Sequence, residues 1–95
     1  MSYRPALTLT VHNAPSVLEA GLRAIAGGQT QFDLSELTVV DSAAVATMLA
    51  WQRAALGDGK SLVFSNLPAN LQSLVNLYGV AELLQASPRA DLPHH

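Results

Sequence analysis

Hydrophobic and polar residues follow two different periods along this chain. From Ala6 to Val11, the apolar residues Leu7, Leu9 and Val11 alternate with polar threonines, which is typical of a strand with one buried face. Other apolar stretches are short and bounded by polar residues or glycine, and we expect each of them to be extended. These stretches are residues 30–34, 37–40 and 61–64.

Between the extended stretches, apolar residues recur every three to four positions, which is the period of an amphipathic helix. Asn13 and Asp41 stand where helices would begin and are favourable caps, while glycines follow the expected helix ends. The predicted helices run from residue 13 to 26, 41 to 56 and 66 to 78, with a last helical turn over residues 81–84.

The second predicted helix carries apolar residues on more than one face. We expect its core-facing stripe to consist of Val45, Leu49, Gln52 and Leu56, with Met48 beside it. Trp51 then lies on the flank of that stripe, together with Ala44, Thr47 and Ala55. There it is either a packing residue at the edge of the core or an anchor for a partner protein. The stripe of the third helix consists of Leu71, Leu74, Val75 and Tyr78.

The order of these elements is β-α-β-α-β-α-α, which predicts an α/β fold with a small parallel or mixed sheet. Because there are few strands, we expect the helices to pack mainly on one face of that sheet. The 95 residues allow one domain. We predict that it spans residues 1–87 and that residues 88–95 form a flexible tail.

Composition and charge exclude several classes of function. Charged residues make up 13% of the chain, about half the usual share, so we expect part of the surface to meet a partner. The net charge is −2 and the five cations are scattered, which argues against binding nucleic acid or an anionic membrane. The N-terminus has no hydrophobic signal core and no apolar run could span a bilayer, so we expect a cytoplasmic protein without direct membrane insertion.

Residues that could carry catalysis are sparse. His12 has no second histidine at ligand spacing, and His94 and His95 end the chain as a native tail or the remainder of a purification tag. The chain has no cysteine, and its glycine pairs follow helices instead of preceding them, so neither a thiolate site nor a phosphate-binding loop is expected. Asp33 and Asp41 lack an accompanying nucleophile, which favours structural capping over acid–base chemistry. We therefore expect no enzyme activity, metal, cofactor or small-molecule substrate.

Small residues open the second predicted helix and leave its backbone accessible. Ser42 would lie exposed there beside Asp41, where it is either a helix cap, a docking contact or a site of phosphorylation. The candidate partner-binding residues are Asp41, Ser42, Ala43, Ala44, Thr47, Ala50 and Trp51.

The stretch FDLSELTVVDSAAVATML, residues 32–49, resembles the signature of STAS domains. The resemblance continues through DGKSLVFSNLPANLQSLVNLYGVAELL and covers about residues 6 to 85. It implies the STAS fold, a small mixed sheet with helices on one side.

The residues after Asp41 distinguish branches of this family. Anti-sigma-factor antagonists have Asp-Ser-Ser-Gly and are phosphorylated on the second serine, where this chain has Ala43. The MlaB-like branch has one hydroxyl residue followed by two small ones, as in Asp41-Ser42-Ala43-Ala44.

The MlaB-like form implies a non-catalytic subunit that binds and stabilises or regulates the ATPase of a phospholipid (Mla-type) ABC transporter maintaining outer-membrane lipid asymmetry. Such a subunit would be peripheral to the inner membrane through the transporter complex. An anti-sigma-factor antagonist that works by partner switching through Ser42 is the alternative, and an enzyme with an unrecognised site is a third hypothesis.

Overall fold

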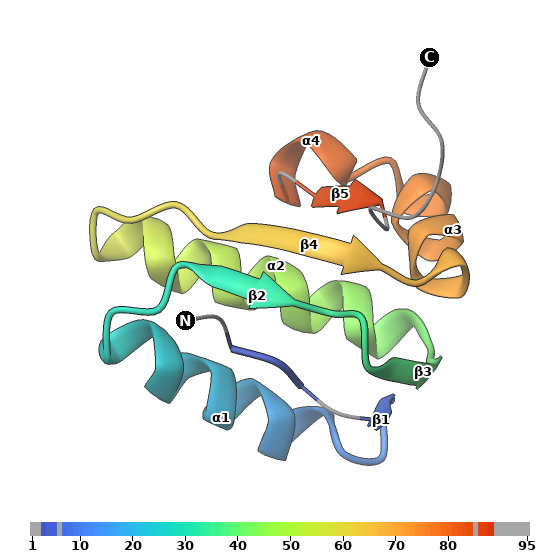
Figure 1. Cartoon of the computed structure of the whole chain (residues 1–95), viewed down its shortest axis with the longest axis horizontal. Coiled ribbons are helices and arrows are strands. Elements are labelled where there is room, and N and C mark those ends of the chain that lie inside the picture. Colours follow the sequence, from blue (N-terminus) through green and yellow to red (C-terminus); the bar gives the residue numbers. More distant parts are fainter. Residues whose placement is uncertain (1–2, 6, 85, 89–95) are drawn as a thin grey trace.

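Strands and helices alternate along the chain in the computed structural model, which describes residues 3–5, 7–84 and 86–88 (Figure 1). The elements are β1 (Leu7–Leu9), α1 (Ala14–Ala26), β2 (Gln31–Asp33), β3 (Leu37–Val40), α2 (Ser42–Gly57), β4 (Val63–Leu67), α3 (Ala69–Tyr78), α4 (Ala81–Leu84) and β5 (Ala86–Pro88). The predicted α/β class is confirmed, and the predicted last turn has the bounds of α4.

The strands form a three-stranded sheet in the order β2-β4-β5 and a separate pair, β1 with β3. Every strand pair among the described residues is parallel, and Phe32 of β2 is opposite Phe64 of β4. Tyr3 extends the larger sheet beyond β2: its N–H donates to the Gln31 carbonyl at 2.9 Å, and its carbonyl accepts from the Asp33 N–H at 2.8 Å. The carboxyl ends of β2, β3 and β4 point toward the same end of the molecule (Figure 1).

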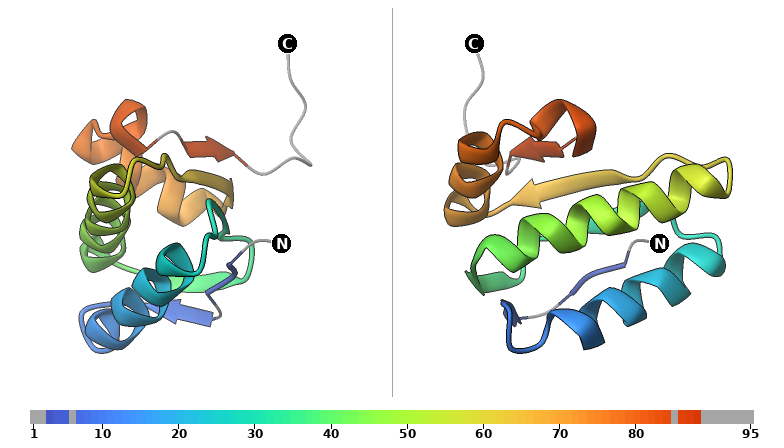
Figure 2. Two further views of the ribbon diagram at one scale, coloured as in Figure 1. Left: turned by 90° about the vertical axis from the view of Figure 1, so that its left-hand side faces the viewer. Right: turned by 180° about the vertical axis from the view of Figure 1, so that it is seen from behind.

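The two longest helices cover one side of the strands. Figure 2 shows α1 and α2 side by side on the same side of β2 and β4, and the two helices contact each other along their length. α3 lies past the carboxyl end of β4, and α4 lies beside α2. The prediction that the helices pack mainly on one face is confirmed.

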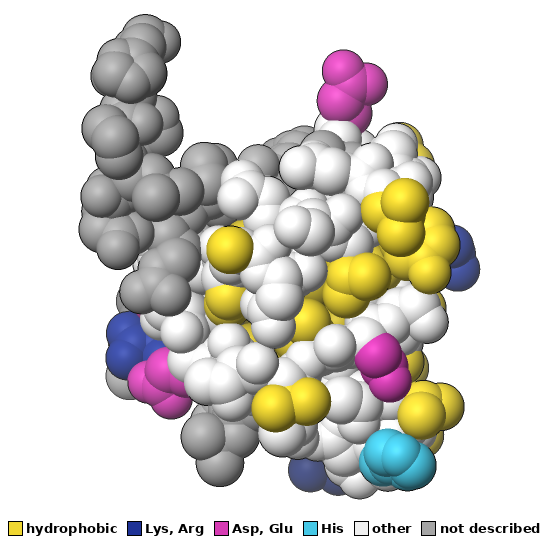
Figure 3. All heavy atoms as spheres, turned by 90° about the vertical axis from the view of Figure 1, so that its right-hand side faces the viewer, with side chains coloured by type: hydrophobic (Ala, Val, Ile, Leu, Met, Phe, Trp, Pro, Cys, Tyr) yellow, Lys and Arg dark blue, Asp and Glu magenta, His cyan; other side chains and the backbone are white. Residues whose placement is uncertain are grey.

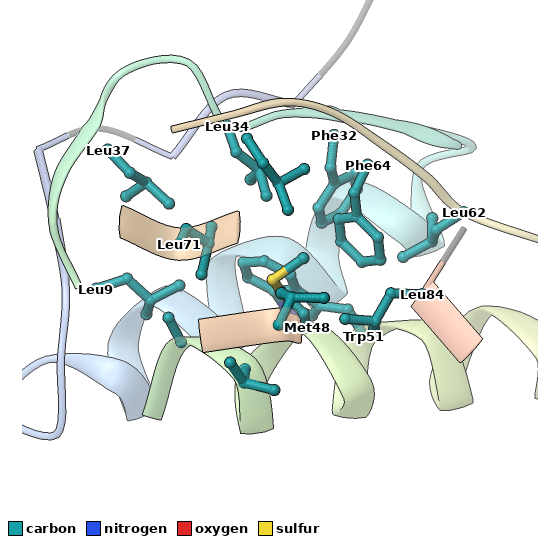
Figure 4. Close-up of a cluster of buried hydrophobic side chains, with 14 of the residues drawn as sticks. Leu9, Phe32, Leu34, Leu37, Met48, Trp51, Leu62, Phe64, Leu71 and Leu84 are labelled. Atoms are coloured by element: carbon teal, nitrogen blue, oxygen red, sulfur yellow. The ribbon is translucent and has the colours of Figure 1, made fainter. Parts of the chain in front are cut away.

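Aromatic side chains fill the space between these helices and the sheet (Figure 4). The ring centroids of Phe32 and Trp51 are 5.0 Å apart, those of Phe32 and Phe64 are 5.9 Å apart, and both pairs meet edge to face. Tyr3 packs on Phe32 with a centroid separation of 4.9 Å. Such edge-to-face pairs add to the stabilisation that burial of the rings provides.

Trp51 is completely buried, so the prediction that it lies at the edge of the core or on a partner surface is wrong. Its indole N–H donates to the Leu18 carbonyl of α1 at 2.9 Å. Gly21, one turn further along α1, leaves the space that the indole occupies, because a Cβ there would overlap the ring. This close approach of α1 turns the predicted flank of α2 into its buried centre. The predicted stripe residue Leu56 is 59% exposed instead.

The C-terminal part of the fold differs from the prediction in two ways. Tyr78, predicted on the core stripe of α3, is 51% exposed, because the helix ends there and Gly79 turns the chain in a left-handed conformation with φ of 66°. The unpredicted strand β5 includes Pro88, so the predicted start of a tail at residue 88 is wrong. A proline fits there because β5 is an edge strand of its sheet. The other residues of the predicted tail, 89–95, lie outside the described residues.

Asp33 closes the turn after β2, as expected of a structural carboxylate. Its Oδ1 accepts hydrogen bonds from the Ser35 backbone N–H at 3.0 Å and from the Asn66 amide at 3.3 Å, and the Arg4 guanidinium lies 3.5 Å from its Oδ2. Burial alone would raise the pKa of the Asp33 carboxyl, but the hydrogen bonds from Ser35 and Asn66 and the charge of Arg4 together hold that pKa below its usual value.

We expect Gly21→Ala to lower the free energy of unfolding by about 1–3 kcal/mol, as overpacking of a core does, because the new Cβ would overlap the Trp51 ring. Chemical denaturation followed by tryptophan fluorescence measures the change. Gly57→Ala at the end of α2 is the matched control, since a Cβ there meets nothing within 4 Å. It should be neutral or stabilising by up to about 1 kcal/mol. Equal stability of the two variants would contradict the close packing.

The Asp33 carboxylate should make stability depend on pH in the acid range. A carboxyl with a depressed pKa contributes stability above its unfolded pKa and loses that contribution as the pH falls through its folded pKa. Asp33→Asn should therefore be less stable than wild type at pH 7, and the difference should shrink below about pH 4. Urea unfolding at pH 7 and pH 3 tests this, with Glu36→Gln as the control for the exposed side of the same cluster. A difference that is constant with pH would contradict the assignment.

Candidate functional site

Asp41 begins the candidate site as the N-cap of α2, which confirms the capping prediction. Its Oδ1 accepts from the Ala43 backbone N–H at 2.8 Å. Its Oδ2 accepts from the Val11 backbone N–H at 3.1 Å, thirty residues away in the sequence. The carboxylate therefore satisfies a free N–H at the start of the helix and also ties the helix to the loop after β1.

The predicted partner-binding residues of α2 do not share one face. Ser42 is exposed, whereas Ala43 and Ala50 are half-buried. Ala44 is completely buried and Thr47 is 4% exposed, so their prediction as partner contacts, like that of Trp51, is wrong. The Thr47 hydroxyl donates to the Ala43 carbonyl at 2.7 Å and so stays within the helix. These residues point inward because α2 turns the Trp51 side of the helix toward α1 and the sheet.

An open groove of about 450 Å³ lies on the outward side of α2. It is lined by Ser42, Val45, Ala46 and Leu49 of α2 and by Tyr78 and Val80 from the end of α3 and the turn after it. Gly79 allows that turn through its positive φ, which brings Tyr78 and Val80 to the same side. On the side of the molecule where α3 lies, hydrophobic side chains form an oblique band with few charges within it (Figure 3).

Of the residues that line this groove, only Ser42 was predicted from the sequence to contact a partner. The sequence also predicted Val45, Leu49 and Tyr78 in the core; Val45 is indeed 4% exposed, whereas Leu49 is half-buried and Tyr78 is 51% exposed. A helix that is apolar on two faces gives no sign of how far each face is covered. The signal that could have identified the groove is a tyrosine at the last position of α3, directly before a helix-ending glycine. A side chain at that position has no further turn of helix beside it.

The side chains that line the groove are apolar apart from the hydroxyl groups of Ser42 and Tyr78. Of its six lining residues, none carries a carboxylate, an imidazole or an ammonium group. Among the described residues, no group of three histidines, aspartates or glutamates lies close enough together to hold a metal ion. Within the same residues, none of the helices has the length and apolar content that crossing a bilayer requires.

The sequence of this chain matches a known protein family. The model of a family described as "Mlab, STAS domain" matches residues 8–85. The chain belongs to the MlaB-type STAS domain family. No curated protein sequence matches the chain.

The STAS fold is also found among solved structures similar to this chain. One is the unphosphorylated form of the anti-sigma factor antagonist SpoIIAA, with a TM-score of 0.60 and 17% sequence identity. The match covers 95% of this chain and 77% of SpoIIAA. At this identity the likeness shows a shared STAS fold.

The two faces of α2 should respond differently to the same substitution. Ala46→Arg should leave the free energy of unfolding within about 0.5 kcal/mol of wild type, because Ala46 is exposed. Thr47→Arg should lower it by at least about 3 kcal/mol, since it places an unpaired charge in the core at a position that is 4% exposed. Thermal and urea unfolding of both variants measure this. Equal stability would mean that α2 is rotated relative to the structure described.

Proposed function

We propose that this STAS domain is a non-catalytic subunit that binds the ATPase of a Mla-type phospholipid ABC transporter. The observation that carries the proposal is the open apolar groove at the start of α2 in an MlaB-type STAS domain. The groove is the proposed contact surface, with Ser42 at one end and Tyr78 at the other side.

The composition of the groove supports a protein partner. Interface centres are depleted in charge and enriched in aromatic and apolar side chains, and the groove combines a half-exposed tyrosine with valine, leucine and alanine. Small residues on α2, such as Ala46, allow the backbone of a partner to approach closely. The free energy falls when a partner covers an apolar surface of this kind, so binding is favoured.

The proposed role follows from binding alone. A protein that binds only the folded ATPase stabilises it by mass action, without carrying a catalytic group of its own. In this way the chain would support a transporter that maintains the lipid asymmetry of the outer membrane, and it would reside at the cytoplasmic face of the inner membrane through the complex.

An anti-sigma-factor antagonist is the second candidate, and the likeness to the fold of SpoIIAA favours it. The start of α2 argues against it. Position 43 is an alanine, so the hydroxyl that the antagonist branch phosphorylates is absent, and Ser42 is the exposed hydroxyl before it. The two candidates differ in partner, since one requires a transporter ATPase and the other an anti-sigma kinase.

Binding to the ATPase of a Mla-type transporter from the same genome tests the proposal. The wild-type chain should bind it, and Ala46→Arg should weaken binding by at least about tenfold, because an interface must then desolvate a charge without a partner. Isothermal titration calorimetry measures the affinity. Ala26→Arg, at an exposed alanine at the end of α1, is the matched control and should bind as wild type does.

Ser42→Glu adds a second comparison on the same proteins. A negative charge in the first turn of α2 interacts favourably with the helix dipole, so the unbound variant should be folded. In the complex, the carboxylates of Asp41 and of the new glutamate at position 42 would lie side by side at the contact surface and should reduce binding. A wild-type chain that binds an anti-sigma kinase and not the ATPase would refute the transporter role. Full binding by both Ala46→Arg and Ser42→Glu would place the contact surface elsewhere.

A further inference from the structure

The loop between β1 and α1 is held in place by side chains although it lies on the surface. The Thr10 N–H donates to Asn13 Oδ1 at 2.9 Å, and the His12 N–H donates to Thr10 Oγ1 at 3.3 Å. The Val11 N–H donates to Asp41 Oδ2 at 3.1 Å. Three successive backbone N–H groups are therefore bound by side-chain oxygens, and the loop has a defined shape.

This fixed loop presents an apolar side chain to solvent. Val11 is 67% exposed. Among the large hydrophobic side chains that are exposed in the described part of the chain, only that of Leu77 is more exposed. A loop that is already ordered loses little conformational entropy when a partner covers it. The exposed and ordered Val11 side chain can therefore contact a partner, although it lies outside the helices and strands.

Asp41 links the Val11 loop to the start of α2. Its two carboxylate oxygens have separate partners, the Ala43 N–H of α2 and the Val11 N–H of the loop. The next residue, Ser42, lines the groove. A single side chain therefore joins the exposed loop to the end of the groove.

We infer that Asp41 is a positioning residue that makes Val11 part of the partner-binding surface. The surface then consists of two parts, the α2–α3 groove and the exposed Val11 side chain, which lies between the polar residues Thr10 and His12 of its loop. The occupant is an apolar patch of the ATPase that spans both parts. This inference rests on the proposed function for the partner, whereas the link between Asp41 and Val11 is a property of the chain alone.

Asp41→Asn separates the two hydrogen bonds of the carboxylate. Asparagine is a favourable N-cap, so its amide oxygen can still accept from the Ala43 N–H. Its NH₂ group then faces the Val11 N–H and cannot accept from it. In the isolated variant, hydrogen exchange measured by NMR should be faster at the Val11 amide and unchanged at the Ala43 amide. An unchanged Val11 exchange rate would overturn the positioning role, whether or not the ATPase binds.

A double-mutant cycle on ATPase binding tests whether Asp41 acts through Val11. Val11→Ala should weaken binding by about fivefold, as expected for the loss of partly buried methyl groups, and Asp41→Asn should weaken it to a similar extent. The double variant should bind no more weakly than the weaker single variant, because both changes remove the same contact. Val63→Ala, at a 43% exposed valine of β4, is the matched control and should bind as wild type does.

The outcomes distinguish this inference from the proposed function. Additive losses in the cycle would mean that Asp41 acts by its own charge, and wild-type affinity in Val11→Ala would remove the loop from the surface; either result overturns the inference and leaves the transporter role intact. A wild-type chain that does not bind the ATPase would overturn the proposed function and with it the two-part surface.

Discussion

The Trp51 ring is completely buried between α1 and the sheet (Figure 4). The indole N–H is bound by the Leu18 carbonyl, its ring lies against Gly21, and its faces and edges meet Phe32 and Phe64. A ring of this size fits in one orientation only, because a polar N–H must find an acceptor when it is buried. α2 is therefore fixed in rotation about its own axis.

That rotation determines which residues of α2 can reach a partner. With Trp51 directed inward, Ala44 and Thr47 are buried with it, and Ser42 and Ala46 are directed outward. The groove is thus a consequence of core packing, and it needs the end of α3 to complete it. A substitution at Gly21 would act on the groove from the opposite side of α2, through the orientation of the helix.

Polar side chains fix the two ends of α2 to the rest of the fold. Near the carboxyl end, the buried Gln52 accepts from the Leu62 N–H at 2.9 Å and donates to the Leu62 carbonyl at 3.0 Å, which ties α2 to the chain entering β4. At the amino end, Asp41 ties α2 to the loop after β1. Both side chains form hydrogen bonds to backbone groups outside α2, so each fixes one end of the helix against another part of the fold.

The order of the elements, the capping role of Asp41, the helix end at Gly79 and the STAS resemblance could be predicted from the sequence, because caps, turns and periodicity depend on neighbouring residues. The fold had to show which face of α2 is most deeply buried, that Ala86–Pro88 forms a strand, and that Tyr78 joins Leu49 in a groove. Each of these depends on partners far away in the sequence, such as Gly21 for Trp51 and the free edge of β4 for β5. Periodicity identifies the apolar faces of a helix, but the shape of its neighbours determines which of them is covered.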